Sequence, residues 1–203
     1  MISSWRRPSL DDPALHQIGR RTAVVAFQGE RGAYAHLAIE SVWGDRAWVM
    51  PAWTFERVVQ EVRSGSATYG VLPVHNVIVG EIPGVQGLIE GARLLVAAEV
   101  TVPVRHCLLG VAGSTMDEVR EACSHPVALQ QCRGFFDRFP AIAMCEGYDT
   151  AGCAREVSAR GRRWQAAIAD GGCAERYGLH MLARDIGDRA DNATRFALVT
   201  RNA

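Results

Sequence analysis

Short apolar runs alternate with amphipathic segments along most of this chain, and this alternation constrains the fold more than any other feature. The run at 22–28 has the length and content of a buried strand, and the segment that begins at Tyr34 places its apolar side chains on one face of a helix. The run at 165–169 leads in the same way into a turn of small residues. Strands that alternate with helices predict an α/β fold.

A nearly continuous apolar stretch at 94–111 interrupts this pattern, and two strands with a crossover between lobes would explain it. The first 21 residues carry four arginines and no apolar run between them, which predicts a polar arm rather than a signal peptide. The expected boundaries are an arm at 1–21 and a catalytic domain at 22–203, with lobe 1 at about 22–100 plus 186–203 and lobe 2 at about 101–185.

Length and charge exclude several classes of protein. The 203 residues suffice for one large domain or two small lobes with a real core. The 22 basic and 22 acidic side chains balance, whereas a protein built around nucleic acid usually carries a basic excess. The longest apolar runs fall far short of the roughly 20 residues that span a bilayer. We therefore expect no nucleic acid, no membrane and a cytoplasmic location.

The reactive side chains narrow the chemistry further. None of the six cysteines forms a Cys-x-x-Cys pair, so buried free thiols are expected, and the six histidines have no metal-ligand spacing. Lysine is absent, because all 22 basic residues are arginine. Covalent chemistry that depends on a lysine, including that of pyridoxal phosphate enzymes, is excluded.

Three loops next to predicted strands carry candidate site residues. The glycines of 29–34 would let backbone amides face an anion at a helix start, although a plain tight turn explains them too. His75 and Asn76 directly follow an apolar strand, where they are either catalytic or satisfy loop backbone groups. Thr194 and Arg195 open the last strand, where a hydroxyl beside a guanidinium suits an anionic substrate, although both residue types are also ordinary at a strand edge.

Taken in order, six motifs between about residues 22 and 201 resemble the catalytic domain of prephenate dehydratase. The motifs are Phe27–Tyr34; Leu72–Asn76 with Gly80; Ser124–Pro126 with Gln131 and Cys132; Asp149–Gly152; Ala166–Ala169 with Ala174 and Tyr177–Leu179; and Ile186, Asp188 and Asn192 with Thr194–Phe196.

This resemblance implies a two-lobed α/β fold similar to type II periplasmic binding proteins, with the active site in the cleft between the lobes. It also implies a homodimer that needs neither a metal nor an organic cofactor. The implied reaction is the decarboxylative dehydration of prephenate to phenylpyruvate, carbon dioxide and water in phenylalanine biosynthesis, which would make the protein a hydro-lyase.

The resemblance also suggests roles for residues. Thr194 would assist the departure of the ring hydroxyl, and Arg195 would supply positive potential. The remaining residues are expected to bind substrate, and they are Gly29, Ala33, Tyr34, His75, Asn76, Ser124, Gln131, Thr150 and Phe196.

Two departures from the family pattern leave alternatives open. His75 stands where the family usually has glutamate, and Val77 stands where it has serine or threonine. Either change could favour arogenate, whose amino group replaces the keto oxygen, or a non-aromatising decarboxylation of prephenate. A ligand-binding module without turnover is a further alternative. The chain ends seven residues after Phe196, so we expect no carboxyl-terminal ACT domain and no phenylalanine feedback through one.

Overall fold

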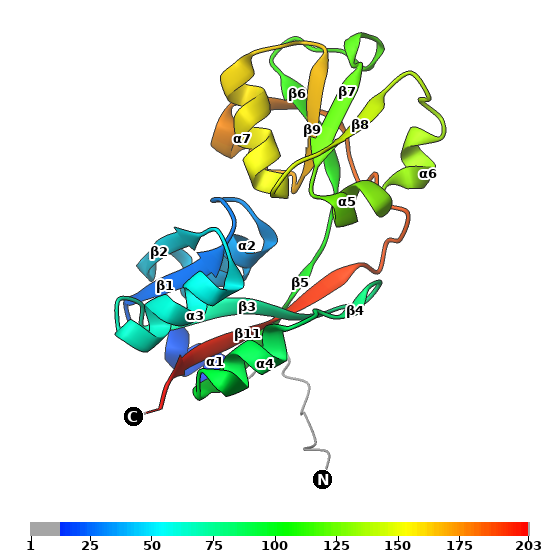
Figure 1. Ribbon diagram of the computed structural model, residues 1–203. Helices are drawn as coiled ribbons and strands as arrows, with labels where there is room; N and C mark the ends of the chain where they lie inside the picture. Colours follow the sequence, from blue (N-terminus) through cyan, green and yellow to red (C-terminus); the bar gives the residue numbers. More distant parts are fainter. Residues whose placement is uncertain (1–12, 203) are drawn as a thin grey trace. The chain divides into compact units, whose positions relative to one another are not determined.

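The computed structural model describes residues 13–202, and its contacts divide them into two units. One unit holds the described residues up to Gln28 together with Ala35–Pro103 and the chain from Ala193 onward. The other holds Gly29–Tyr34 and Val104–Asn192. Each unit has its own sheet and its own helices, which confirms the predicted α/β class (Figure 1).

The first unit contains a six-stranded mixed sheet in the order β2-β1-β3-β11-β5, with β4 paired to β3. Strands β1, β2 and β3 pair in parallel, whereas β11 is antiparallel to both of its neighbours. The elements are α1 (Pro13–Gly19), β1 (Ala23–Gln28), α2 (Tyr34–Trp43), a 3-10 turn (Gly44–Arg46), β2 (Ala47–Ala52), α3 (Phe55–Ser64), β3 (Tyr69–Asn76), β4 (Gly80–Glu81), α4 (Val85–Gly91), β5 (Leu94–Pro103) and β11 (Ala193–Arg201).

Helix α3 illustrates how the sequence builds this unit. Its N-cap residue Thr54 accepts a hydrogen bond from the Arg57 amide at 3.2 Å, and Gly65 ends the helix in the left-handed conformation. The valines of α3 share one face and pack together with Leu72, Ala197 and residues of α4. Helices α3 and α4 lie beside the sheet of this unit in Figure 1. One part of the core therefore lies between the sheet and helices α3 and α4, and further fully buried side chains outside this cluster include Phe27, Ile39 and Trp43.

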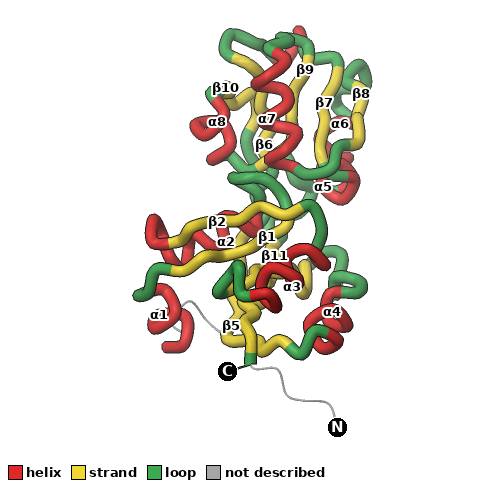
Figure 2. The backbone as a smooth tube through the Cα atoms, turned by 60° about the vertical axis from the view of Figure 1, so that its left-hand side comes forward, coloured by secondary structure: helices red, strands yellow, loops and turns green. Residues whose placement is uncertain are grey.

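The second unit contains a five-stranded sheet in the order β10-β6-β9-β7-β8. Its elements are β6 (Cys107–Val111), a 3-10 turn (Met116–Glu118), β7 (Glu121–Ser124), α5 (Pro126–Gln130), α6 (Arg133–Phe136), β8 (Ala143–Glu146), α7 (Thr150–Arg160), β9 (Gln165–Ala169), α8 (Gly172–Tyr177) and β10 (Leu179–Ala183). Helices cover both faces of this sheet (Figure 2).

Strand β9 explains why the sequence at 165–169 is apolar throughout. Successive side chains point to opposite faces, so Ala167 and Ala169 pack in the cluster that contains α7, while Ala166 and Ile168 pack in the cluster that contains α5 and α6. All six cysteines are free thiols, as predicted, and five of them are buried. Within residues 13–202, no helix is long and apolar enough to cross a bilayer.

The structure differs from the sequence prediction in several elements. His75 and Asn76 end strand β3 and pair with the short strand β4, whereas the sequence suggested that an irregular stretch begins at His75. The apolar side chains of Leu129, Cys132, Phe136 and Phe139 predict one helix after Ser124–Pro126, but the structure divides this segment into α5 and α6. Pro83 suggests the first residue of a helix, but α4 begins at Val85.

The unit boundaries also lie elsewhere than the sequence suggested. The chain passes between the units at Pro103 and Ala193 rather than near residues 100 and 186, and the Gly29–Tyr34 loop groups with the second unit. Within the segment expected as a polar arm, Pro13–Gly19 forms helix α1, in which Leu15 is buried. Residues 1–12 of that arm lie outside the described residues.

Candidate functional site

The strand directions of the first unit bring Thr194 next to Asn76. Asn76 is the last residue of β3, and Thr194 is the second residue of β11. Because β11 runs antiparallel to β3, the beginning of β11 lies at the same edge of the sheet as the carboxyl end of β3, and the register pairs Thr194 with Asn76. Two predicted site residues that are 118 positions apart are thus neighbours.

The side chain of Asn76 has a fixed orientation. Its Oδ1 accepts hydrogen bonds from the amides of Ile78 at 2.9 Å and Val79 at 3.1 Å. Its Nδ2 therefore points the other way and donates to Thr194 Oγ1 at 2.9 Å and to the Ala193 carbonyl at 3.1 Å. Asn76 and Thr194 are only 5% and 9% exposed. The Thr194 hydroxyl accepts a bond from a buried amide, and its own proton takes no part in that bond.

Arg195 lies on the opposite face of the sheet from Thr194, because successive residues of a strand alternate. Its Nε forms an ion pair at 3.3 Å with Oε2 of Glu99, which comes from the neighbouring strand β5 and is 6% exposed in its side chain. Burial raises the pKa of the Glu99 carboxyl, against the opposing effect of Arg195. The register also aligns Arg195 with His75, and His75 with Glu81 of β4.

In the second unit, the Gly29–Tyr34 loop is bound through a carboxylate of the protein itself. The amide of Glu30 donates to Asp149 Oδ2 at 3.1 Å, and the same oxygen accepts from the Gly152 amide at 3.0 Å at the start of α7. The predicted ability of this loop to receive a carboxylate is thus used by Asp149 at the Glu30 amide. Burial raises the pKa of Asp149, although these amide bonds oppose the shift.

Backbone conformation and close packing explain why this loop has glycine at positions 29 and 32. Gly29 and Gly32 both adopt positive φ values, of 109° and 95°. A Cβ atom on Gly29 would meet Asp149 Oδ1 at 3.2 Å, and one on Gly32 would meet the sulfur of Cys173 at 2.8 Å. The loop can approach the second unit this closely because both positions lack a side chain.

Four side chains of the second unit form a continuous chain of hydrogen bonds. The Tyr34 hydroxyl lies 3.1 Å from His106 Nδ1 and also donates to the Arg105 carbonyl at 3.0 Å. His106 Nε2 lies 3.0 Å from Gln131 Oε1, and Asn192 Nδ2 donates to the same oxygen at 3.0 Å. Tyr34 and Gln131 were predicted from the sequence to bind substrate, and the structure connects them through His106.

The remaining predicted residues are more enclosed. Ser124 is fully buried, and its hydroxyl donates to the Ile168 carbonyl at 2.7 Å, so a structural bond already uses its proton. Thr150 begins α7 directly after its N-cap Asp149, while Ala33 and Phe196 are buried. Substrate contact by these four residues stays a prediction.

Sequence reasoning missed Glu99 and His106 as parts of these arrangements. Both interrupt the apolar stretch at 94–111, and a polar residue within such a stretch is the signal that could have identified them. A buried carboxylate or imidazole needs a partner, but the stretch itself does not say which one.

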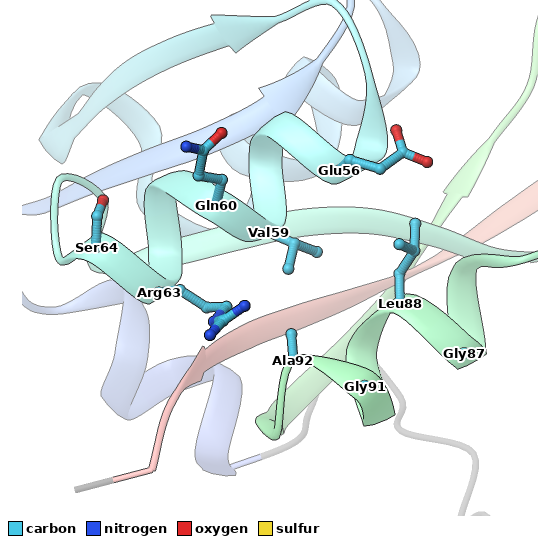
Figure 3. Close-up of a pocket in the computed structure, with 9 residues that line it drawn as sticks. All are labelled: Glu56, Val59, Gln60, Arg63, Ser64, Gly87, Leu88, Gly91 and Ala92. Carbon is cyan, nitrogen blue, oxygen red and sulfur yellow. The ribbon is translucent and has the colours of Figure 1, made fainter.

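The first unit also has an open groove of about 540 Å³ between α3 and α4. Val59 faces Leu88 and Ala92 across it, and Glu56 and Arg63 lie along α3 (Figure 3). None of the predicted site residues lines this groove. Among residues 13–202, no group of three or more histidine, cysteine, aspartate or glutamate side chains has the arrangement of a metal site.

Comparisons with known proteins give one consistent result. A family model described as prephenate dehydratase matches residues 25–203. A bifunctional N-acyl-homoserine lactone acylase/prephenate dehydratase of Komagataeibacter europaeus is 36% identical over 179 residues, which are 88% of this chain and 63% of that protein. Arogenate dehydratase/prephenate dehydratase 2 of Arabidopsis thaliana, a chloroplastic protein, is 34% identical over 177 residues, which are 87% of this chain and 46% of that protein.

A solved structure agrees with these sequence matches. Prephenate dehydratase of Arthrobacter aurescens, determined in complex with L-Phe, has a TM-score of 0.79 to this chain at 28% identity. The match covers 89% of this chain and 61% of that one. The chain thus spans between about half and two thirds of the length of these relatives.

Proposed function

Because the chain belongs to the prephenate dehydratase family, we propose that it converts prephenate to phenylpyruvate. The substrate loses its ring carboxylate as carbon dioxide, and the electron pair of the broken C–C bond moves into the ring and expels the hydroxyl from the opposite carbon. The hydroxyl leaves as water once it receives a proton. Formation of the aromatic ring drives the reaction, so the protein must bind two carboxylates, hold the ring and supply the proton.

The hydrogen bond from Asn76 Nδ2 to Thr194 Oγ1 is the observation that carries this proposal. Threonine is a very weak acid, so the proton must move to the leaving hydroxyl while the C–O bond breaks. During that transfer negative charge develops on Thr194 Oγ1, and a buried amide N–H directed at this oxygen stabilises the charge. Asn76 therefore makes Thr194 a better proton donor.

Arg195 supplies the positive charge in this proposal. Its Nε pairs with Glu99 at 3.3 Å, and since Arg195 and Thr194 lie on opposite faces of the sheet, Arg195 contributes positive potential rather than a direct contact to the reacting hydroxyl. Gln131 and Tyr34 would contribute polar groups from the second unit. The predicted position of the active site in a cleft between the lobes, a homodimeric assembly and a cytoplasmic location belong to this proposal and await measurement.

Prephenate rather than arogenate is the substrate that we propose. His75, in register with Arg195, replaces a family glutamate. The sequence alone leaves open whether this change favours arogenate. We propose the opposite, because a carboxylate at this position would attract the ammonium group of arogenate, whereas an imidazole does not. A direct comparison of turnover with the two substrates tests this preference.

The test is to incubate the protein with prephenate at neutral pH and to identify the product by mass spectrometry, with arogenate in a parallel reaction. Neutral pH matters because prephenate aromatises spontaneously in acid. We expect enzyme-dependent phenylpyruvate, its loss in Thr194→Ala and partial retention in Thr194→Ser, which keeps the hydroxyl.

Other products would identify the alternatives. A decarboxylated product that keeps its hydroxyl would indicate the non-aromatising reaction, and binding without turnover would indicate a ligand-binding module. Near-normal activity in Thr194→Ala would exclude Thr194 as the proton donor. Faster turnover of arogenate than of prephenate would reverse the proposed preference.

A further inference from the structure

His106 is a buried histidine for which the proposed reaction has no role. It is 3% exposed, and it lies between two residues that are expected to bind substrate, Tyr34 and Gln131. Gln131 is itself 8% exposed, and Asn192, which bonds to it, is 4% exposed. A chain of buried polar groups of this kind is well defined only when each donor meets an acceptor.

The donors of this chain can be assigned in order. The Nδ2 atom of Asn192 can only donate a hydrogen bond. The Gln131 atom that it contacts must therefore be an acceptor, which is the carboxamide oxygen. The same oxygen lies 3.0 Å from His106 Nε2, which must therefore carry a hydrogen. A neutral imidazole has one N–H, so Nδ1 is an acceptor, and the single hydrogen of the Tyr34 hydroxyl is shared between this nitrogen at 3.1 Å and the Arg105 carbonyl at 3.0 Å.

The charge states agree with this assignment. Burial lowers the pKa of His106, although the Gln131 bond and the Asp170 carboxylate oppose the shift, and the imidazole is therefore neutral near pH 7. Burial also raises the pKa of the Tyr34 phenol well above its ordinary value, and Asp170 adds to the effect. The Tyr34 phenol therefore stays protonated and can act as a hydrogen-bond donor.

We propose that His106 is a positioning residue, which holds the oxygen of the Gln131 carboxamide inward and so presents its NH₂ group to an acceptor oxygen of the substrate. The inference rests on the proposed function for the identity of that substrate. Two bonds to Oε1, from His106 and Asn192, fix the orientation, and the amide nitrogen takes part in neither. The NH₂ group of Gln131 can only donate hydrogen bonds. It therefore suits a carboxylate or keto oxygen of the substrate and not an ammonium group.

The tautomer of His106 can be measured without any substrate. In protein labelled with ¹⁵N-histidine, the two ring nitrogens differ in chemical shift according to which one carries the hydrogen, and loss of signals in His106→Gln identifies this residue. We expect the tautomer with hydrogen on Nε2. Hydrogen on Nδ1 and a bare Nε2 would mean that Gln131 faces the imidazole with its nitrogen, and this result would overturn the inference.

Ligand binding tests the consequence. Affinity for prephenate is measured by calorimetry in the Thr194→Ala background, which prevents turnover. His106→Leu removes the donor and should weaken binding about tenfold, as expected for a hydrogen bond to a charged group. His106→Gln restores an N–H and should recover most of this loss. His180→Leu, an exposed histidine on β10 of the same unit, is the matched control and should bind like its parent.

Gln131→Glu tests the polarity of the site. It replaces the NH₂ group by a carboxylate oxygen, so it should weaken prephenate binding at least as much as His106→Leu, whereas tighter binding would contradict a donor site. In the otherwise wild-type protein, His106→Leu should raise KM and leave kcat nearly unchanged.

The two proposals fail in different ways. Normal binding in a folded His106→Leu variant of an active enzyme would overturn the role of His106 and leave the proposed function standing. A wild-type protein that neither binds nor converts prephenate would overturn the proposed function and, with it, the ligand that this inference assigns to Gln131.

Discussion

At the residue scale, the carboxamide of Asn76 has two roles, because it binds backbone amides of a turn and also contacts the proposed proton donor. Its oxygen accepts from two amides of the following turn, and its nitrogen donates to the threonine that we propose as proton donor. The turn therefore fixes which end of the amide faces Thr194. A side chain that satisfies backbone groups and also polarises a hydroxyl cannot be replaced without affecting one role or the other.

Asn76→Asp separates these two roles. A carboxylate still accepts from the Ile78 and Val79 amides, but it cannot donate to Thr194 and it places negative charge beside the developing alkoxide. We expect kcat to fall roughly 100-fold to 1,000-fold, the effect of losing one donor to a developing oxyanion, with a smaller change in KM. Steady-state kinetics and a urea unfolding curve check this together. A loss of activity that follows a loss of stability would contradict the catalytic role.

The sequence points to Asn76 and Thr194 as candidate site residues, but it does not show which residues pair with Arg195 and His106. Asn76 is visible in the sequence as a polar residue directly after an apolar strand, and Thr194 as a polar residue that opens the last strand. The partnership of Glu99 with Arg195 depends on the register between β5 and β11, which the apolar pattern does not specify. In the sequence His106 is visible only as an interruption of the apolar stretch at 94–111, because its side-chain partners, Tyr34 and Gln131, come from two other segments of the chain.

At the scale of elements, most differences between the predicted and the observed structure lie in short strands and in one loop. Strands with continuous apolar runs, such as β1 and β9, were predicted nearly to the residue. Strands β7 and β10, of four and five residues, carry polar side chains that hide their periodicity. The Gly29–Tyr34 loop was expected to stay with lobe 1, yet the amide of Glu30 and its bond to Asp149 place it in the second unit.

Gly32→Ala measures how tightly this loop packs. The residue has a φ of 95°, and a Cβ would lie 2.8 Å from the sulfur of Cys173, so both backbone strain and overpacking oppose the change. Gly113→Ala is the matched control, because its φ of 81° imposes similar strain and nothing lies within 4 Å of the added atom. We expect Gly113→Ala to cost about 1 kcal/mol of unfolding free energy, and Gly32→Ala about 1–3 kcal/mol more. Equal costs in urea unfolding would contradict close packing of the loop.

The charge of the whole molecule is unusual because arginine supplies all 22 basic side chains. A guanidinium keeps its proton far above pH 10, where lysine would lose it. Arginine ion pairs such as Arg155 with Glu30 at 3.1 Å and Arg163 with Glu118 at 2.7 Å therefore persist into alkaline solution. Three half-buried phenols, by contrast, lose their protons in alkali, and at a higher pH in the folded chain than in the unfolded one.

Alkaline titration should reveal these phenols. Burial raises the pKa of Tyr148 and of Tyr177 to about 12, and it raises that of Tyr34 well above the ordinary value of 10. A phenol whose pKa is higher in the folded than in the unfolded state stabilises the fold below pH 10, and this contribution is lost as the pH rises toward 12. Phenolate absorbance at 295 nm should therefore rise later in native protein than in urea. Coincident native and denatured curves would contradict the burial of these side chains.

Strand β11 has a consequence for the way a ribosome produces this protein. It lies between β3 and β5, and the chain of the second unit is synthesised after β5 and before β11. During translation, β3 and β5 must therefore wait with unpaired edges until the strand that joins them has emerged. Exposed strand edges invite pairing with other chains, so a nascent molecule of this topology is expected to rely on chaperones more than one whose sheet is completed in sequence order.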